Sequence, residues 1–276
     1  MASPATTALF PDQGVAVADL KYQLQLGGGQ YINLTGIPDS FLWDKLIAAE
    51  AAAERALRTF FSPVQVIPDT APQSEIDALV AAGTRYVTTS GFDYDPAMFQ
   101  AERWGLMNLP FKPAQSVQSV IIAFPAPFLM NYTVPPEWIR IDRKYAHLQL
   151  VPTTSAAVSP VGAFALVAIG GAVTYPQAIQ VRYIAGLTNA NGDVVSSFAE
   201  NWADLIDLVK RMAIMNVMRM GFLPSSGSIS ADGLSQSNSF NYKAWQDGID
   251  ESLYGPKGSN GGLFASIHGI NGWVLG

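Results

Sequence analysis

The residues whose types and spacing could do chemistry are few, and they are poorly grouped. Gly27–Gly29 form a glycine run of the kind that can cradle phosphate, but no Lys-Ser/Thr pair follows it as a phosphate loop requires. Asp93 and Asp95 could offer oxygen ligands to a metal ion, yet no glutamate after them closes a calcium-binding loop. We therefore interpret the glycines as a hinge and the aspartates as turn formers.

Carboxylates in pairs can hydrolyse glycosides, and Glu137 and Asp142 are one such pair in the sequence. Both flank one short alternating segment, where ion pairs with Arg143 and Lys144 are the simpler expectation. We interpret these residues as structural.

Histidine and cysteine chemistry is equally sparse. The chain contains two histidines, His147 and His268, and no cysteine. A lone histidine beside apolar residues more often packs or hydrogen bonds than acts as a base. The absence of cysteine excludes disulfides, thiolate metal ligands and cysteine nucleophiles. We predict no enzymatic activity and no catalytic, cofactor-binding or metal-binding residues.

The composition indicates a chain that buries surface against partners. Of 276 residues, 49% are hydrophobic and only 14% are charged, whereas about a quarter is usual. The net charge of −6 argues against a surface that grips nucleic acid. No apolar run is long enough to span a membrane. Met1–Pro4 lack the features of a signal peptide, so we expect assembly in a cytoplasm.

The elements that must position any site are helical at both ends and β-rich in the middle. Apolar residues at steps of three and four predict a helix over 41–60, and a short helix fits 74–82. Alternating segments between 114 and 186 predict a small antiparallel sheet or sandwich, including a hairpin around 143–146. A capping-box pattern at 197–200 predicts a long helix that ends near Met220.

The second half of that long helix is apolar on nearly every side. A helix that is apolar all round must be buried all round, and packing between subunits is the simplest way to achieve this. We therefore predict a subunit interface at Met212, Ile214, Met215 and Met218.

The predicted fold class is α+β, with four parts. Residues 1–38 form a flexible or draped segment. Residues 39–113 and 187–254 form a helical core, and 114–186 form an inserted antiparallel β domain. Residues 255–276 are rich in glycine but carry apolar anchors, so we expect an extended C-terminal arm that orders on a partner.

The order of several short phrases resembles the long form of the head-to-tail connector (adaptor, head-completion) proteins of tailed bacteriophages. An alanine-rich helix near the N-terminus comes first. The phrases that follow it are PAQSVQSV at 113–120, PEWIRI at 136–141, LQLVPT at 148–153, YPQAIQVRYIAG at 175–186 before a long helix, and SISADGLSQS at 228–237. The resemblance covers roughly residues 40–250.

The resemblance implies a helical bundle with a β insertion that assembles into a ring of about twelve copies under the portal. Such a ring extends the DNA channel without binding DNA specifically and meets a tail terminator or another neck protein, in the neck of the virion. The C-terminal segment of the family docks on the portal protein. That role falls here on Phe240, Trp245, Leu253, Tyr254, Leu263, Phe264, Ile267 and Trp273. The sequence departs from the family where a glycine-rich arm replaces a basic terminal helix, so the arm could instead grip a neighbouring subunit.

Two alternatives remain open at this point. One is another neck or tail-completion ring protein, for which the same composition is expected. The other is a carbohydrate-binding or tail-associated module on the β region, with Trp104, Trp138 and Tyr132 as an exposed sugar platform.

Overall fold

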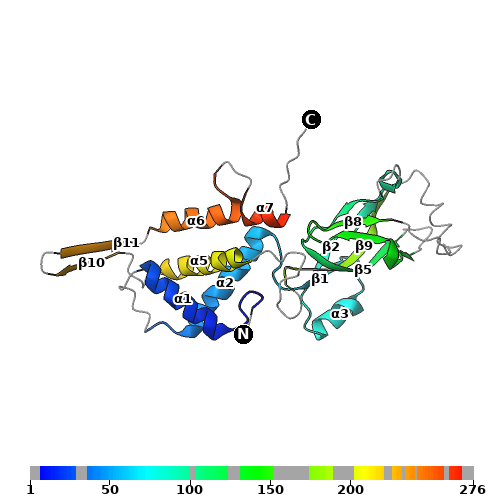
Figure 1. Cartoon of the computed structure of the whole chain (residues 1–276). Helices are drawn as coiled ribbons and strands as arrows, with labels where there is room; N and C mark the ends of the chain where they lie inside the picture. Colours follow the sequence, from blue (N-terminus) through cyan, green and yellow to red (C-terminus); the bar gives the residue numbers. More distant parts are fainter. Residues whose placement is uncertain are drawn as a thin grey trace. The chain divides into compact units, whose positions relative to one another are not determined.

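The computed structural model forms two compact units, which we call the helical unit and the β unit. The helical unit combines residues 1–58 with 199–276, and the β unit spans 59–198. The residues described are 7–28, 36–99, 104–123, 131–151, 174–188, 202–220, 226–231, 234–239, 241–257 and 261–268. Helices gather in the first unit and most strands in the second (Figure 1), which confirms the predicted α+β class.

Among the described residues, five helices build the helical unit. They are α1 (Gln13–Gly28), α2 (Asp39–Leu57), α5 (Ala203–Met218), α6 (Tyr242–Tyr254) and α7 (Gly262–His268). Helix α2 packs against α5, α1 contacts both, and α6 contacts α5 and α7. The predicted stripe on α2 is the buried one, because Leu42, Leu46, Ala49, Ala53 and Leu57 recur at helical spacing and are all fully buried.

Helix α5 is covered by its own chain rather than by a neighbour. Its buried residues lie on several faces: Leu205, Leu208, Val209, Ala213, Ile214, Met215, Val217 and Met218. Helices α1, α2 and α6 all pack against it, which makes α5 the central helix of the unit. The all-round apolar character of α5 therefore does not require a second subunit, contrary to the prediction.

The N-terminal segment belongs to the same core. Phe10, Val17, Leu20 and Leu24 are buried, so residues 7–28 are not a flexible or draped extension. Upstream of α1, the chain is held by the buried carboxylate of Glu50 on α2, which accepts hydrogen bonds from Thr7 Oγ1 at 2.6 Å and from the Ala8 amide at 3.2 Å.

The middle of the predicted C-terminal arm is a helix. Within α7, Leu263 and Ile267 are 5% and 0% exposed, and α7 packs against α6 and α2. The expectation of an extended arm is therefore wrong for residues 262–268, because two apolar anchors four residues apart suffice for a short amphipathic helix despite the surrounding glycines. Residues 269–276 lie outside the described residues.

In its described part, the β unit contains two sheets around one apolar core. In the larger sheet the strand order is β2-β1-β9-β5-β6, with β3 also paired to β9, and in the smaller it is β4-β8-β7. The strands are β1 (Val64–Pro68), β2 (Tyr86–Thr89), β3 (Phe92–Tyr94), β4 (Met107–Asn108), β5 (Ala114–Ala123), β6 (Asn131–Thr133), β7 (Ile139–Asp142), β8 (His147–Leu150) and β9 (Tyr175–Ala185). Ile179, Val181 and Tyr183 of β9 share the core with Leu148 and Leu150 of β8, as the alternation of the sequence predicts.

The β unit is larger than the expected insertion at 114–186. It begins at Thr59 because β1, β2 and β3 join the same sheet as β9. Strands β1 and β2 are parallel and are connected through helix α3 (Gln73–Ala81). The sequence does not predict the short strands of this region, because they alternate over too few residues to give a clear period.

One further two-stranded sheet belongs to the segment between α5 and α6. Strands β10 (Ser226–Ala231) and β11 (Leu234–Ser239) pair antiparallel in continuous register from Ser226↔Ser239 to Ala231↔Leu234. The label β10–β11 marks this ribbon in Figure 1.

Candidate interaction surfaces

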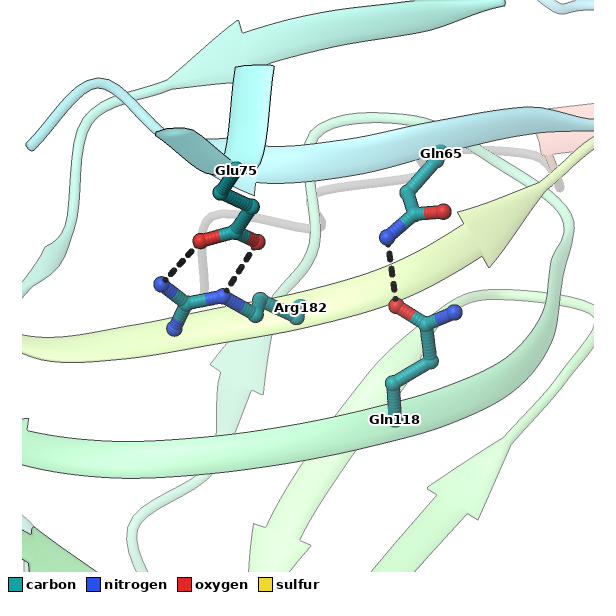
Figure 2. A network of polar contacts seen from close by, with 4 residues as sticks. All are labelled: Gln65, Glu75, Gln118 and Arg182. Atoms are coloured by element: carbon teal, nitrogen blue, oxygen red, sulfur yellow. Dashed lines mark hydrogen bonds and ion pairs between the residues drawn. The ribbon is translucent and has the colours of Figure 1, made fainter. Parts of the chain in front are cut away.

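The best-defined polar cluster of the β unit lies on the larger sheet. Arg182 of β9 donates from Nε and Nη2 to the two carboxylate oxygens of Glu75 on α3, at 2.8 and 2.9 Å. The Gln65 amide of β1 donates to Gln118 of β5 at 3.0 Å, reaching over β9 (Figure 2). The bidentate pair fixes α3, none of whose residues is fully buried, onto the sheet.

The charge of Arg182 also sets the ionisation of its partner. Hydrogen bonding to the guanidinium, more than the desolvation that opposes it, lowers the pKa of Glu75 below 4.5. The third nitrogen, Arg182 Nη1, is buried and has no hydrogen-bond partner among the described residues. No sequence pattern could reveal this pair, because its members are 107 residues apart.

The aspartates near the predicted turns and hairpin accept hydrogen bonds from backbone amides. Asp95 Oδ1 accepts from the Ala97 amide at 2.9 Å, and Asp93 Oδ1 accepts from the Gln177 amide at 2.8 Å. Asp142 Oδ1 accepts from the amides of Lys144 and Tyr145 in the β7–β8 hairpin. Asp95 is thus a turn former, as predicted, whereas Asp93 lies in β3 and links it to Gln177 of β9, so the prediction of a turn is wrong for Asp93. Asp142 stabilises the hairpin by capping the turn, a role that the expected ion pairs with its neighbours did not anticipate.

The sugar platform considered above does not exist in this arrangement. Trp138 is 5% exposed and forms part of the core of the β unit, with its ring 6.5 Å from that of Tyr132. Trp104 is 37% exposed. A buried tryptophan cannot stack on a ligand, so the correction follows directly from its packing.

The residues expected to dock on a partner divide by burial. Leu253, Leu263 and Ile267 are buried in the helical unit and stabilise it instead. Tyr254 is 51% exposed, while Trp245 and Phe264 are half-buried. Phe240 and Trp273 lie outside the described residues.

Tyr254, Phe264 and His268 form a continuous aromatic group where α6 meets α7, which we call the α6–α7 aromatic group. The ring centroids of Tyr254 and Phe264 are 6.1 Å apart, and those of Phe264 and His268 are 4.6 Å apart. His268 is tied to the end of α2, because its Nε2 lies 2.5 Å from the Leu57 carbonyl oxygen. Tyr254 is the exposed member of this group, and Phe264 and His268 are half-buried.

The predicted subunit-interface residues also differ in access. Ile214, Met215 and Met218 are each 2% exposed within one chain, so they are core residues. Met212 is half-buried, and its contact with a second subunit stays a prediction.

Sequence reasoning missed an exposed apolar stripe on α1. Val15 and Tyr22 are 67% and 60% exposed, on the side opposite the buried Val17 and Leu24. Their separation of seven residues places them on one helical face, a spacing that could have been read from the sequence.

Other kinds of site find no support among the described residues. No group of three or more histidine, aspartate or glutamate side chains is placed to hold a metal ion. None of the described helices has the length and apolarity needed to cross a membrane.

The buried Tyr183 hydroxyl accepts a hydrogen bond from the Phe111 amide at 3.1 Å. Burial raises the pKa of Tyr183, so this contact is a structural hydrogen bond of the core.

The fold defines a two-unit α+β chain. No protein-family model matches the sequence, and no curated protein matches it. A chain of a solved structure described as "Neck of empty GTA particle computed with C6 symmetry" aligns over 90% of this chain and 93% of its own length. The two share 16% sequence identity, with a TM-score of 0.38, below the level at which two chains share a fold.

Proposed function

We propose that this chain is a structural virion protein that forms an adaptor ring between the portal and the tail or neck of a tailed bacteriophage. The observation that carries the proposal is the insertion architecture. Two distant segments, 1–58 and 199–276, make one helical unit, and the segment between them makes a β unit. A helical bundle with a β insertion is what the sequence resemblance implies.

The phrases that carry the resemblance lie on ordered elements. Residues 113–120 form the start of β5, 136–141 lead into β7, and 175–186 cover β9. Helix α5 is the next helix along the described chain. These three phrases therefore lie on or beside strands of the β unit, which supports the proposal.

The α6–α7 aromatic group, through its exposed Tyr254, supplies the docking surface in this proposal. Tyr254 projects half its surface into solvent beside Phe264, and aromatic residues are enriched at the centres of protein interfaces. The chain's net charge of −6 fits a channel wall past which DNA slides without being held.

The test is binding to a portal ring of the same virus. The purified chain should bind the ring and form an assembly of defined mass, and chemical cross-linking in particles should join it to the portal. Cross-links to the tail tube alone would instead support a tail-completion ring. Absence of binding to both would refute a role in the neck.

A matched pair of substitutions tests the docking surface. Tyr254→Ala should weaken portal binding by at least about 30-fold, since a central aromatic anchor contributes about 2 kcal/mol or more. Tyr22→Ala removes an equally exposed tyrosine from α1 and should leave portal binding unchanged. Equal effects of the two substitutions would show that the α6–α7 aromatic group is not the docking surface.

A further inference from the structure

The hairpin β10–β11 is a sheet without neighbours among the described strands. Its six registered pairs run without a bulge, and neither strand joins another sheet. An isolated two-stranded ribbon is only marginally stable in water. In the two strands, Ile229 and Leu234 are the only large apolar residues, so the ribbon has little apolar surface with which to stabilise itself.

Neither outer edge of the hairpin pairs with another of the strands that the structure describes. Proteins usually protect a free edge with a charged residue, a proline or a bulge. Strands β10 and β11, with the sequences SGSISA and LSQSNS, contain no charged residue and no proline. The sequence around the hairpin therefore leaves its edges available for a further strand.

The register gives the hairpin one uniform face. Cross-strand partners share a face, and Ser226, Ser228 and Ser230 pair with Ser239, Ser237 and Ser235. Six serines thus occupy one face of the ribbon. Because Ala231 pairs with Leu234 across a two-residue connection, the serine positions are expected to direct their N–H and C=O groups outward, to the free edges.

The chemistry of the strands favours a second copy of this chain as the occupant. Copies that each carry a net charge of −6 repel one another, but the hairpin strands are neutral and can approach without that penalty. The two edges differ, one belonging to β10 and the other to β11, so a head-to-tail contact uses both. In a cyclic ring such contacts close on themselves and leave no edge free.

We propose that β10 of each copy pairs antiparallel with β11 of the next copy, so that the hairpins close into one continuous β-barrel with two strands from every subunit. This inference rests on the proposed ring. A ring of about twelve copies would give about 24 strands, more than the 16–18 that already enclose an aqueous channel in porins. The barrel would thus be a neutral collar around the channel, with one wholly serine face.

Cysteine mapping tests the pairing directly, because the chain has no cysteine of its own. Single variants are made at Ser226, Ser228 and Ser230 on β10, and another set at Ser235, Ser237 and Ser239 on β11. Each β10 variant is mixed with each β11 variant, assembled on the portal ring and oxidised. Since every chain carries one thiol, no disulfide can form within a chain.

The expected result is a disulfide dimer of twice the 29.6 kDa chain mass in at least one mixed sample and in no single variant alone. Dimers of single variants alone would mean that like strands pair, which overturns the inference. Rings that assemble but yield no dimer in any mixture would overturn it while leaving the proposed function intact. If no ring assembles at all, both the strand pairing inferred here and the proposed function are refuted.

A second pair of variants measures the contribution of the edge. Ser237→Pro removes an outward N–H at a position where the hairpin itself is not expected to lose a hydrogen bond, and Ser237→Ala keeps that N–H. The proline variant should lose the ring at concentrations where the alanine variant retains it. Equal assembly of the two would show that the β11 edge is not used.

Discussion

Replacement of Ile267 by alanine tests whether the C-terminal segment is part of the helical unit. Ile267 is completely buried in α7, and Leu263 one turn before it is 5% exposed. The neighbouring His268 contacts the Leu57 carbonyl oxygen at the end of α2. If α7 is docked as described, shortening this side chain leaves a cavity between α7 and the helices it covers.

The size of the effect follows from the burial. Truncation of a fully buried isoleucine to alanine costs about 2–5 kcal/mol. Because α7 is short and near the end of the chain, its surroundings relax easily, and we expect the lower part of this range, about 2–3 kcal/mol. That corresponds to an increase of about 30- to 150-fold in the population of the undocked helix, at 1.36 kcal/mol for each factor of ten.

Amide hydrogen exchange is the suitable assay, because a chain of two units need not unfold in one step. Ile267→Ala should speed exchange in α7 and at the end of α2, and leave the β unit unchanged. Ser266→Ala, at an exposed position of the same helix, is the control and should have no such effect. If the two variants exchange alike, α7 is not docked, and the extended arm expected from the sequence is the better description of this segment.

The remaining predictions concern unfolding measured by chemical denaturation. Burial raises the pKa of Glu50 above 4.5, so the wild type should gain stability relative to Glu50→Gln as pH falls from 7 towards that value; a constant difference would contradict this. Hydrogen bonding to Arg182 lowers the pKa of Glu75, so the pair stabilises above pH 4.5 and its contribution fades as pH falls below it. Glu75→Gln should cost about 1–2 kcal/mol at neutral pH, and no loss would mean that α3 does not need the pair. Gly186→Ala should cost about 2 kcal/mol or more, because the backbone has φ of +143° and a Cβ would lie 2.7 Å from a carbonyl oxygen. Gly248→Ala, where a Cβ meets nothing within 4 Å inside α6, should instead stabilise by about 0.5–1 kcal/mol.

The elements that could be predicted are those with a long, regular period. Helix α2 and strand β9 carry apolar residues at clean spacings of three to four and of two, and the structure confirms both. The turn formed by Asp95 was also predictable, because a short carboxylate beside proline satisfies a local amide. These features depend on neighbours in sequence, which a single sequence displays.

What could not be predicted depends on partners distant in sequence. The all-round apolar surface of α5 is covered by α1, α2 and α6 of the same chain, but periodicity cannot distinguish these neighbours from a second subunit. Glu50 is charged yet buried, because its oxygens satisfy residues about 40 positions away. Helix α7 could not be predicted because it has only seven residues. The glycines around it predict a break in helical structure more strongly than its two apolar anchors predict a helix.

The two ends of the β unit are held side by side by the hydrogen bonds from Leu187 N to Phe60 O and from Thr188 N to Phe61 O, both 2.9 Å. Strand β1 also pairs with β9 as the outermost partners in sequence. A segment whose two ends lie close together can be inserted into another domain without forcing that domain's helices apart. Residues 59–188 should therefore fold when expressed alone. Another domain whose ends lie close together could replace them through a short Gly/Ser linker, and the helices of the helical unit would keep their packing.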